Sequence, residues 1–395
     1  MAGPLGGVRV LSFGRALSGP FAAMLLADLG AEVIKIETPK IGDFARANGP
    51  FVEGIGSYFL SINRGKKSFT LNLKKDRAKK MVFKLVEQVD VVLENFRPGV
   101  MDSLGLGYEV MREHNPKIIF ASISGFGQNG PYAQRPAYDM IAQGMGGVVS
   151  ITGTPGGPPV RVGYSIGDMG ASLFTVIAIC AALYERERSG KGQQIDVAMM
   201  DSQVALCENA CARYFASGKV PKPLGSRHPL LTPFQIFQTQ DGSIVLIAFA
   251  DNDFKNFCRA AGKEDWISDE RFNTLGARLQ NYALFEKEMN ELMRTRTTKA
   301  WLKALDDHSV MCGPVNDIEQ VVNDPHVQAR EMIREVTHPR AGKLKVVGTP
   351  MKFSRTPCQI EKASPDLGEH NQEVAQTLLG LSEEELETLK KEGVI

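Results

Sequence analysis

The chain has 395 residues, of which 43% are hydrophobic and 23% charged, and this profile is typical of a folded protein rather than a disordered one. Its 46 lysines and arginines nearly balance its 45 aspartates and glutamates, which argues against a general nucleic-acid or anionic-membrane surface. No signal-peptide pattern opens the sequence, and the longest apolar run, about 171–183, is shorter than a membrane span. We therefore expect a cytoplasmic protein with no membrane segment.

The first 200 residues alternate between strand-like and helix-like periodicity. Strands are expected over residues 8–13, 32–37, 68–73, 89–94, 117–124 and 194–198. Helices are expected over residues 19–29, 76–88, 108–114 and 169–186. Strands that alternate with helices predict an α/β fold, here a Rossmann-like parallel sheet with helices on its faces.

The pattern changes after about residue 200. Strands at 234–239 and 243–249 flank Asp241-Gly242, a hairpin turn, and helices are expected at 202–216, 277–295, 299–308 and 382–392. The segment from Val336 to the last helix is expected to be irregular. We divide the chain into a large Rossmann-like domain (1–200), a linker (201–225), a small α+β domain (226–330) and a return segment that packs on the large domain (331–395).

The six cysteines and six histidines form none of the usual metal-binding spacings. Cys207 and Cys211 stand one helical turn apart, but no second Cys or His pair accompanies them. Free, reduced thiols and the absence of a metal are therefore expected.

A parallel sheet is also typical of dinucleotide-binding proteins. In such a site Glu37, at the end of a strand, would bind a ribose. The glycine fingerprint is missing, because the chain after the first strand reads Gly14-Arg-Ala-Leu-Ser-Gly19. Glu37 is then expected to be a surface residue at the end of a strand.

A basic cluster lies at the strand boundaries, in residues 63–68, at Lys74 and Lys75 and in residues 94–99. Open α/β sheets collect ligand-binding loops there, so arginine and lysine could neutralise a phosphorylated ligand. A solvated charged rim is the alternative, and composition alone favours it.

Asp168 stands between Gly167 and Gly170, directly before a long apolar helix. Aspartate is among the best helix N-caps, and spacing alone favours that role. The flanking glycines clear side-chain bulk from around the carboxylate, which would suit a nucleophile.

Taken in order, these motifs resemble those of the family III CoA-transferases over nearly the whole chain. The matching stretches are residues 10–13, 19–20, 29–37, 42–46, 63–68, 94–99, 124–127, 138–139, 167–168, 190–193, 227–229 and 312–315. The resemblance implies an interlocked homodimer whose substrates are an acyl-CoA and a small carboxylic acid, with CoA bound as a substrate and not as a prosthetic group.

The resemblance also assigns residues. Asp168 matches the catalytic aspartate of the family. The CoA contacts would come from Arg15, Ala16, Leu71, Lys74, Asn95, Phe96, Arg97, Arg135 and Tyr138. The family often has an arginine where Ser103 stands and a basic or polar residue at Thr38, so contacts at these two positions are left open.

An aspartate suits this reaction because its carboxylate can attack an acyl-CoA thioester to give a mixed anhydride, and CoA thiolate can then attack the aspartyl carbonyl to give an aspartyl-CoA thioester. Succinyl-CoA and a small dicarboxylate are the expected pair, with the distal carboxylate held by a set of basic residues. These are Arg46, Arg64, Arg227 and His228.

Two alternatives remain at this stage. The related α-methylacyl-CoA racemases use a histidine as a base, and this chain has Tyr138 at that position, which favours the transferase. The other alternative is a catalytically silent CoA-binding subunit of a hetero-oligomer.

Overall fold

The computed structural model describes residues 3–395, which divide into two compact units. The larger unit comprises the chain up to Val149, Arg161–Gly218 and His326–Ile395. The smaller unit comprises Ser150–Val160 and Lys219–Pro325. Each unit has its own hydrophobic core and is described separately.

A six-stranded parallel sheet forms the centre of the larger unit. In spatial order its strands are β5 (Lys66–Thr70), β2 (Glu32–Glu37), β1 (Arg9–Ser12), β6 (Val91–Glu94), β7 (Ile119–Ser124) and β8 (Gln194–Ala198). The strand order reverses between β1 and β6, as in a doubly wound Rossmann-like sheet. The predicted α/β fold with a parallel sheet is confirmed.

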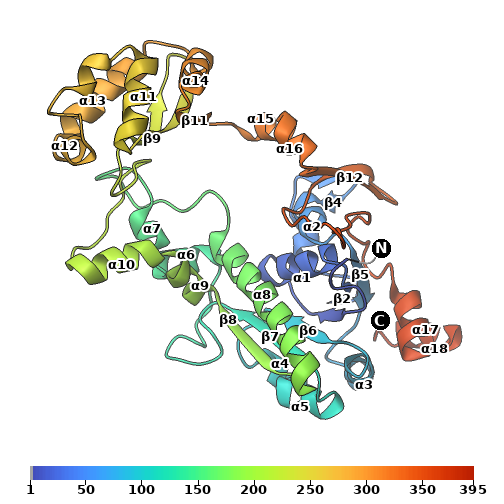
Figure 1. The fold of residues 1–395 in the computed structure, drawn as a ribbon. Helices are drawn as coiled ribbons and strands as arrows, with labels where there is room; N and C mark the ends of the chain where they lie inside the picture. Colours follow the sequence, from blue (N-terminus) through green and yellow to red (C-terminus); the bar gives the residue numbers. More distant parts are fainter. Residues whose placement is uncertain (1–2) are drawn as a thin grey trace. The chain divides into compact units, whose positions relative to one another are not determined.

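Helices cover both faces of this sheet because neighbouring residues of each strand point to opposite sides. On β1, Val10 packs into one core cluster and Leu11 into the other. The first face carries α1 (Ser18–Asp28) and α8 (Ile166–Ser189), and the second carries α3 (Asp76–Val86), α5 (Tyr108–His114), α17 (Asn371–Leu379) and α18 (Glu383–Lys391) (Figure 1).

Helix α8 is long and apolar enough to cross a membrane by length and composition. Half of the most apolar 18-residue stretch of α8 is buried, and Ala171, Val176 and Ile179 pack in the core against α1. We therefore treat α8 as a core helix.

Smaller elements complete the larger unit. They are η1 (Phe44–Ala47), β3 (Phe51–Val52), β4 (Ile55–Gly56), α2 (Ser57–Ile62), α4 (Val100–Ser103), α6 (Asp139–Met145), α9 (Met199–Leu206), α10 (Glu208–Ser217), β12 (Ile333–His338) and β13 (Gly342–Val347). The helices α7 (Val148–Ile151) and α16 (Pro325–Ala329) lie at the unit boundaries.

Three secondary-structure predictions were wrong in detail. The single helix expected over 202–216 is two helices, since α9 ends at Leu206 and α10 begins at Glu208. The helix expected over 277–295 is likewise split. The segment after Val336 is not irregular at its start, because β12 and β13 form an antiparallel hairpin over a small core of Val336, Val346 and Ile360.

The smaller unit is an α+β structure around a three-stranded antiparallel sheet, in the order β11 (Met311–Pro314), β10 (Ser243–Ile247), β9 (Phe234–Gln238). Its helices are α11 (Asp251–Ala261), η2 (Glu264–Ile267), α12 (Leu275–Gln280), α13 (Tyr282–Met293), α14 (Thr298–Asp306) and α15 (Ile318–Asn323). Trp301, Phe254 and Phe285 lie at the centre of its core.

Candidate active site

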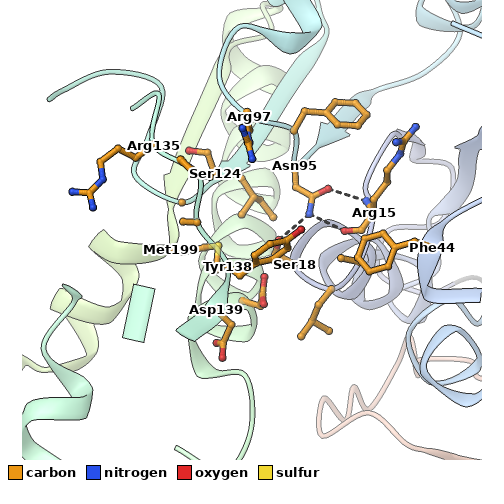
Figure 2. A pocket seen from close by; sticks show the side chains of 18 of the residues that line it. Arg15, Ser18, Phe44, Asn95, Arg97, Ser124, Arg135, Tyr138, Asp139 and Met199 are labelled. Carbon is orange, nitrogen blue, oxygen red and sulfur yellow. Dashed lines mark hydrogen bonds between the residues drawn. The ribbon is translucent and has the colours of Figure 1, made fainter. Parts of the chain in front are cut away.

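A large cavity of the larger unit lies where the strand order reverses. It has a volume of about 750 Å³ and is bordered by the loops that follow β1 and β6, the crevice in which doubly wound sheets bind ligands. Its lining residues are Arg15, Ala16, Leu17, Ser18, Phe44, Asn48, Gly49, Tyr58, Asn95, Phe96, Arg97, Pro98, Ile123, Ser124, Gly125, Arg135, Pro136, Ala137, Tyr138, Asp139, Asp168 and Met199 (Figure 2).

Asp168 lies in the first turn of α8, and the helix already begins at Ile166. The N-cap interpretation is therefore wrong. The backbone N–H of Gly167 is instead bonded to Asp139 Oδ1 at 2.8 Å, so a carboxylate from α6 satisfies this end of α8.

The two flanking glycines serve close packing. A Cβ at Gly167 would lie 2.9 Å from Asp139 Oδ1, and one at Gly170 would lie 3.1 Å from the side chain of Leu206. They allow α6 and α9 to approach α8, whereas the sequence suggested that they clear space around the carboxylate.

The environment of Asp168 shifts the pKa of its carboxyl group but leaves this group ionised at neutral pH. Burial raises the pKa of Asp168 to about 6, and the neighbouring charge of Asp139 acts in the same direction. Hydrogen bonds from the hydroxyl and the backbone N–H of Ser18 oppose this rise. Asp168 is consequently an anion at neutral pH, although it is largely buried.

The loop after β1 is held from the β6 side by Asn95. Asn95 Oδ1 accepts the N–H of Arg15 at 2.8 Å, and Asn95 Nδ2 donates to the carbonyl of Arg15 at 2.9 Å and to Ser18 Oγ at 3.0 Å (Figure 2). The loop and the first residue of α1 are thus fixed by one side chain.

A buried ion pair also holds the loop that follows β1. Lys35 Nζ lies 2.9 Å from Asp43 Oδ2 and donates to the carbonyl of Gly14 at 2.7 Å. Asp43 Oδ1 accepts the N–H of Ala16 at 3.2 Å, and Ala16 has a φ of 63°, in the left-handed region that L residues rarely adopt. The buried pair compensates for the strained backbone at this position.

The predicted CoA contacts fall in two neighbouring pockets. Those that line the large cavity together with Asp168 are Arg15, Ala16, Asn95, Phe96, Arg97, Arg135 and Tyr138. Leu71 and Lys74 line a second pocket of about 260 Å³, which shares Arg15 and Phe96 with the first. The structure therefore brings all the predicted positions to one region of the larger unit, while their roles stay a prediction.

The two positions left open by the sequence differ. Thr38 lines the second pocket, and its Oγ1 accepts a hydrogen bond from Arg15 Nη2 at 3.1 Å. Ser103 lies on α4 and donates its hydroxyl to the carbonyl of Val100 at 2.7 Å.

Glu37 is not the surface residue that the sequence predicted. It is 3% exposed and pairs with Arg46 Nη2 at 2.7 Å. Burial raises the pKa of Glu37, but the bond to Arg46 and the charges of Lys35 and Arg46 outweigh burial and lower this pKa to about 2.

Two members of the basic cluster, Arg64 and Lys66, belong neither to a solvated rim nor to a phosphate site. Arg64 is buried and pairs with Asp28 at 2.6 Å, and Lys66 Nζ donates to three oxygens, those of Pro20, Ile62 and Asn63. These side chains hold α1, α2 and β5 together.

The four basic residues that were expected to bind the distal carboxylate of the substrate all have other partners in the structure. Arg46 and Arg64 are in ion pairs and lie outside the lining of the large cavity. In the smaller unit, Arg227 stacks on Tyr282 at 3.9 Å and His228 stacks on Phe234 at 4.9 Å.

Sequence reasoning missed three residues of the site. Ser18 lines the cavity together with Asp168, Asp139 accepts the N–H of Gly167 at the start of α8, and Tyr58 also lines the cavity. Burial and the nearby carboxylates raise the pKa of Tyr58 to about 12, so its hydroxyl keeps its proton. The one available signal was that Ser18 adjoins the matching stretch 19–20 and Asp139 lies within the matching stretch 138–139.

Within residues 3–395, no group of three or more His, Cys, Asp or Glu side chains is arranged to hold a metal ion. The polar groups of the site are instead arginines, amides, hydroxyls and carboxylates, a set that suits an anionic organic substrate.

Comparison with known proteins assigns the family. The model of CoA-transferase family III matches residues 5–371. The chain belongs to this family. It is therefore a CoA-transferase, and the arrangement around Asp168 can be considered in terms of that reaction.

Similar proteins with assigned activities span nearly the same length. A succinyl-CoA:mesaconate CoA-transferase of Haloarcula hispanica is 39% identical over 94% of this chain and 96% of its own. A succinate–glutarate CoA-transferase of Agrobacterium fabrum is 40% identical over 94% of each chain. The crystal structure of a CAIB/BAIF family protein from Brucella suis matches with a TM-score of 0.87 and 37% identity, covering 96% of this chain and 100% of that one.

Proposed function

We propose that this CoA-transferase moves CoA from succinyl-CoA to a second dicarboxylic acid, with Asp168 as the nucleophile. The observation that carries this proposal is the carboxylate itself: Asp168 is largely buried in the wall of the main cavity, yet its pKa of about 6 leaves it ionised at neutral pH. A desolvated carboxylate is a stronger nucleophile than a hydrated one, and the cavity limits the access of water to reactive intermediates.

The reaction begins when a carboxylate oxygen of Asp168 bonds to the acyl carbon of the donor. The carbon–sulfur bond breaks, CoA leaves as its thiolate, and a mixed anhydride remains on Asp168. The thiolate then attacks the aspartyl carbonyl, which releases succinate and leaves an aspartyl-CoA thioester.

The acceptor acid completes the transfer by the reverse steps. Its carboxylate attacks the aspartyl thioester, again expelling CoA thiolate and forming an anhydride. Attack of the thiolate on the acceptor's acyl carbon gives the new acyl-CoA and regenerates Asp168, so no water enters and no redox change occurs.

The CoA moiety would occupy the two connected pockets. Lys74 and Arg15 supply positive charge for its phosphates, and Phe96 and Leu71 supply apolar surface. Arg15 also stacks on the ring of Phe96 at 5.2 Å, which fixes its guanidinium between the pockets.

The choice of a dicarboxylate rests on the relatives, whose names pair succinyl-CoA or succinate with mesaconate or glutarate. Since Arg46 and Arg64 are engaged elsewhere, Asn48 and Tyr58 are the donors in the cavity that we assign to the distal carboxylate.

A cytoplasmic homodimer is part of the same proposal. The six cysteines are free thiols in the described chain, as is usual in a reducing compartment. Helix α8 exposes Leu173, Ile177 and Tyr184, and α10 exposes Phe215, which would be covered in a dimer.

The proposal is tested by incubating the purified chain with succinyl-CoA and a panel of acids: glutarate, mesaconate, oxalate and acetate. New acyl-CoA is followed by mass spectrometry for the parent, for Asp168→Asn, and for Asp201→Asn as a matched control, because Asp201 lies in the first turn of the neighbouring helix α9. We expect transfer to the dicarboxylates, loss of at least a thousandfold in Asp168→Asn, and little change in the control.

Other outcomes identify the alternatives. Exchange of the α-proton of a 2-methylacyl-CoA in D₂O without acid exchange would indicate a racemase. CoA binding by the purified chain without any turnover would indicate a silent subunit.

A further inference from the structure

The side chain of Glu94 is buried at the carboxyl end of β6, directly before the loop that leads to α4, and is 4% exposed. Its Oε2 accepts the backbone N–H of Phe96 at 2.7 Å. We propose that Glu94 is a positioning residue for CoA: it fixes residues 95–97 in the conformation that places Phe96 and Arg97 along the CoA pockets. The kinetic part of this inference rests on the proposed function, and the structural part does not.

The first step concerns the loop between β6 and α4. Residues 95–99 belong to neither element, so their conformation depends on contacts other than those of a regular strand or helix. Pro98 has no N–H to donate, and Gly99 has a φ of 83°, in the left-handed region that favours glycine. The bond from the Phe96 N–H to Glu94 therefore fixes the part of the loop that precedes this turn.

The second step concerns the side chains that the loop carries. Phe96 lines both CoA pockets, and Arg97 lines the large cavity. The guanidinium of Arg15 lies 5.2 Å from the centre of the Phe96 ring. In the other direction, Asn95 is bonded to the backbone of Arg15 (Figure 2). A change in the backbone at Phe96 would therefore displace side chains that face CoA and the side chain that holds the loop after β1.

The third step is that Glu94 acts through the loop. Among the described residues, Glu94 is absent from the linings of both CoA pockets. It lines a separate cavity of about 160 Å³, together with Arg97 and Ser122, its neighbour on β7. The printed contact by which Glu94 reaches the CoA region is consequently its bond to the N–H of Phe96.

The environment of Glu94 indicates which property of its side chain the loop requires. Burial raises the pKa of Glu94 to about 7, and the charges of Asp102 and Asp196 act in the same direction. Hydrogen bonds from Ser122 and from the N–H of Phe96 oppose this rise. At neutral pH about half of the Glu94 carboxyl groups are therefore protonated, and either form keeps an oxygen that can accept the N–H. The acceptor oxygen, more than the charge, is the required property.

The test compares Glu94→Ala, which removes the acceptor, with Glu94→Gln, which keeps an oxygen of the same reach without the charge. Asp90→Ala is the matched control. Asp90 directly precedes β6 at the opposite end of the strand, and its Oδ2 accepts the backbone N–H of Arg9 at 2.8 Å. The control also breaks the ion pair of Asp90 with Arg186, so it shows whether general destabilisation affects CoA binding.

Hydrogen exchange without ligand, followed by mass spectrometry, measures the structural part. We expect the segment 95–97 to exchange about tenfold faster in Glu94→Ala and close to the parental rate in Glu94→Gln. Asp90→Ala should leave this segment unchanged and accelerate exchange at Arg9 instead. Glu94→Leu fills the space of the side chain without an acceptor, and the same result is expected from it if Glu94→Ala does not fold.

Calorimetry with CoA and steady-state kinetics with succinyl-CoA measure the functional part. We expect Glu94→Ala to raise the Kd for CoA and the KM for succinyl-CoA about tenfold, with kcat within about twofold of the parent. Glu94→Gln should stay within about threefold of the parent in Kd and KM, and Asp90→Ala should match the parent.

Three results would overturn the inference. They are parental exchange of residues 95–97 or a parental KM in Glu94→Ala, equal losses in Glu94→Ala and Glu94→Gln, and an equal rise of KM in Asp90→Ala. The exchange experiment distinguishes this failure from failure of the proposed function, because it needs neither CoA nor turnover.

Discussion

At the scale of single residues, Asp168 has properties that favour chemistry at the expense of stability. Its pKa rises from 3.8 to about 6 on folding, chiefly because the carboxylate is buried. Between these two pH values the folded protein retains a proton that the unfolded chain releases. Folding stability therefore falls as the pH rises through this window, and the cost is fully present above about pH 6.

Replacing Asp168 by Asn should remove this cost. We expect the variant to be more stable than the parent by about 1–3 kcal/mol at pH 7, and equally stable at pH 4, where the aspartate is largely protonated in the folded state. Urea denaturation at the two pH values measures the difference. A variant that is less stable than the parent at pH 7 would contradict the proposed electrostatic cost.

The pKa of Glu37 shifts in the opposite direction, and its effect on folding stability is therefore also opposite. Its pKa is lowered from 4.5 to about 2, so its pair with Arg46 contributes stability above pH 4.5 that is lost as the pH falls towards 2. Glu37→Gln leaves Arg46 without its anionic partner, and we expect a loss of about 3 kcal/mol at pH 7 by urea denaturation.

Glu392→Gln is the matched control for this variant. It breaks an ion pair of similar length with Arg77, but both side chains are about half exposed. Exposed pairs contribute less than about 1 kcal/mol, so the control should unfold close to the parent. Equal effects of the two substitutions would show that burial does not determine the strength of the Glu37 pair.

At the scale of elements, the contact between α6 and α8 affects both the start of helix α8 and the pKa of Asp168. Asp139 accepts the N–H of Gly167 at the start of α8, and its charge raises the pKa of Asp168. Asp139→Asn keeps an oxygen for Gly167 and removes the charge. The acid limb of the kcat/KM profile for succinyl-CoA should then move to lower pH.

The comparison for this prediction is Asp139→Ala. It removes both the charge and the acceptor, so it should show the same shift in the pH profile together with an additional loss of about 1 kcal/mol in stability. An acid limb that moves to higher pH in Asp139→Asn would contradict the assigned electrostatic role.

The elements that the sequence predicted best were those with a strong period. All six strands of the parallel sheet were located, since buried strands such as β6 and β7 carry short apolar runs between turns. The breaks at Cys207 and Asn281 were missed because neither site carries a proline or glycine. The β12–β13 hairpin was missed because Val336 and Val346 are its main buried apolar side chains.

The position of the site could be predicted from the sequence, but most contacts between its side chains could not. The switch point and the motifs around Asp168 and Asn95 could be found from order along the chain. The burial of Glu37 and Lys66, and the position of Ser18 in the same cavity wall as Asp168, depend on contacts between segments distant in sequence. Residue type alone assigns such charged side chains to the surface.

At the scale of the whole molecule, the exposed apolar side chains of α8 bear on assembly. Ile177 is 64% exposed at the middle of this helix, in line with Leu173 and Tyr184. We expect light scattering to give about twice the chain mass of 43.2 kDa for the parent and a lower mass for Ile177→Asp. A parent that elutes as a single chain at micromolar concentration would refute the proposed dimer.

Mapping the covalent intermediate shows whether Asp168 carries CoA during the reaction. The protein is incubated with succinyl-CoA, quenched, treated with hydroxylamine and digested, and the modified peptide is sequenced by mass spectrometry. We expect a hydroxamate on Asp168 of the parent and none in Asp168→Asn. A hydroxamate on another carboxylate, or CoA transfer by Asp168→Asn at the parental rate, would contradict this role of Asp168.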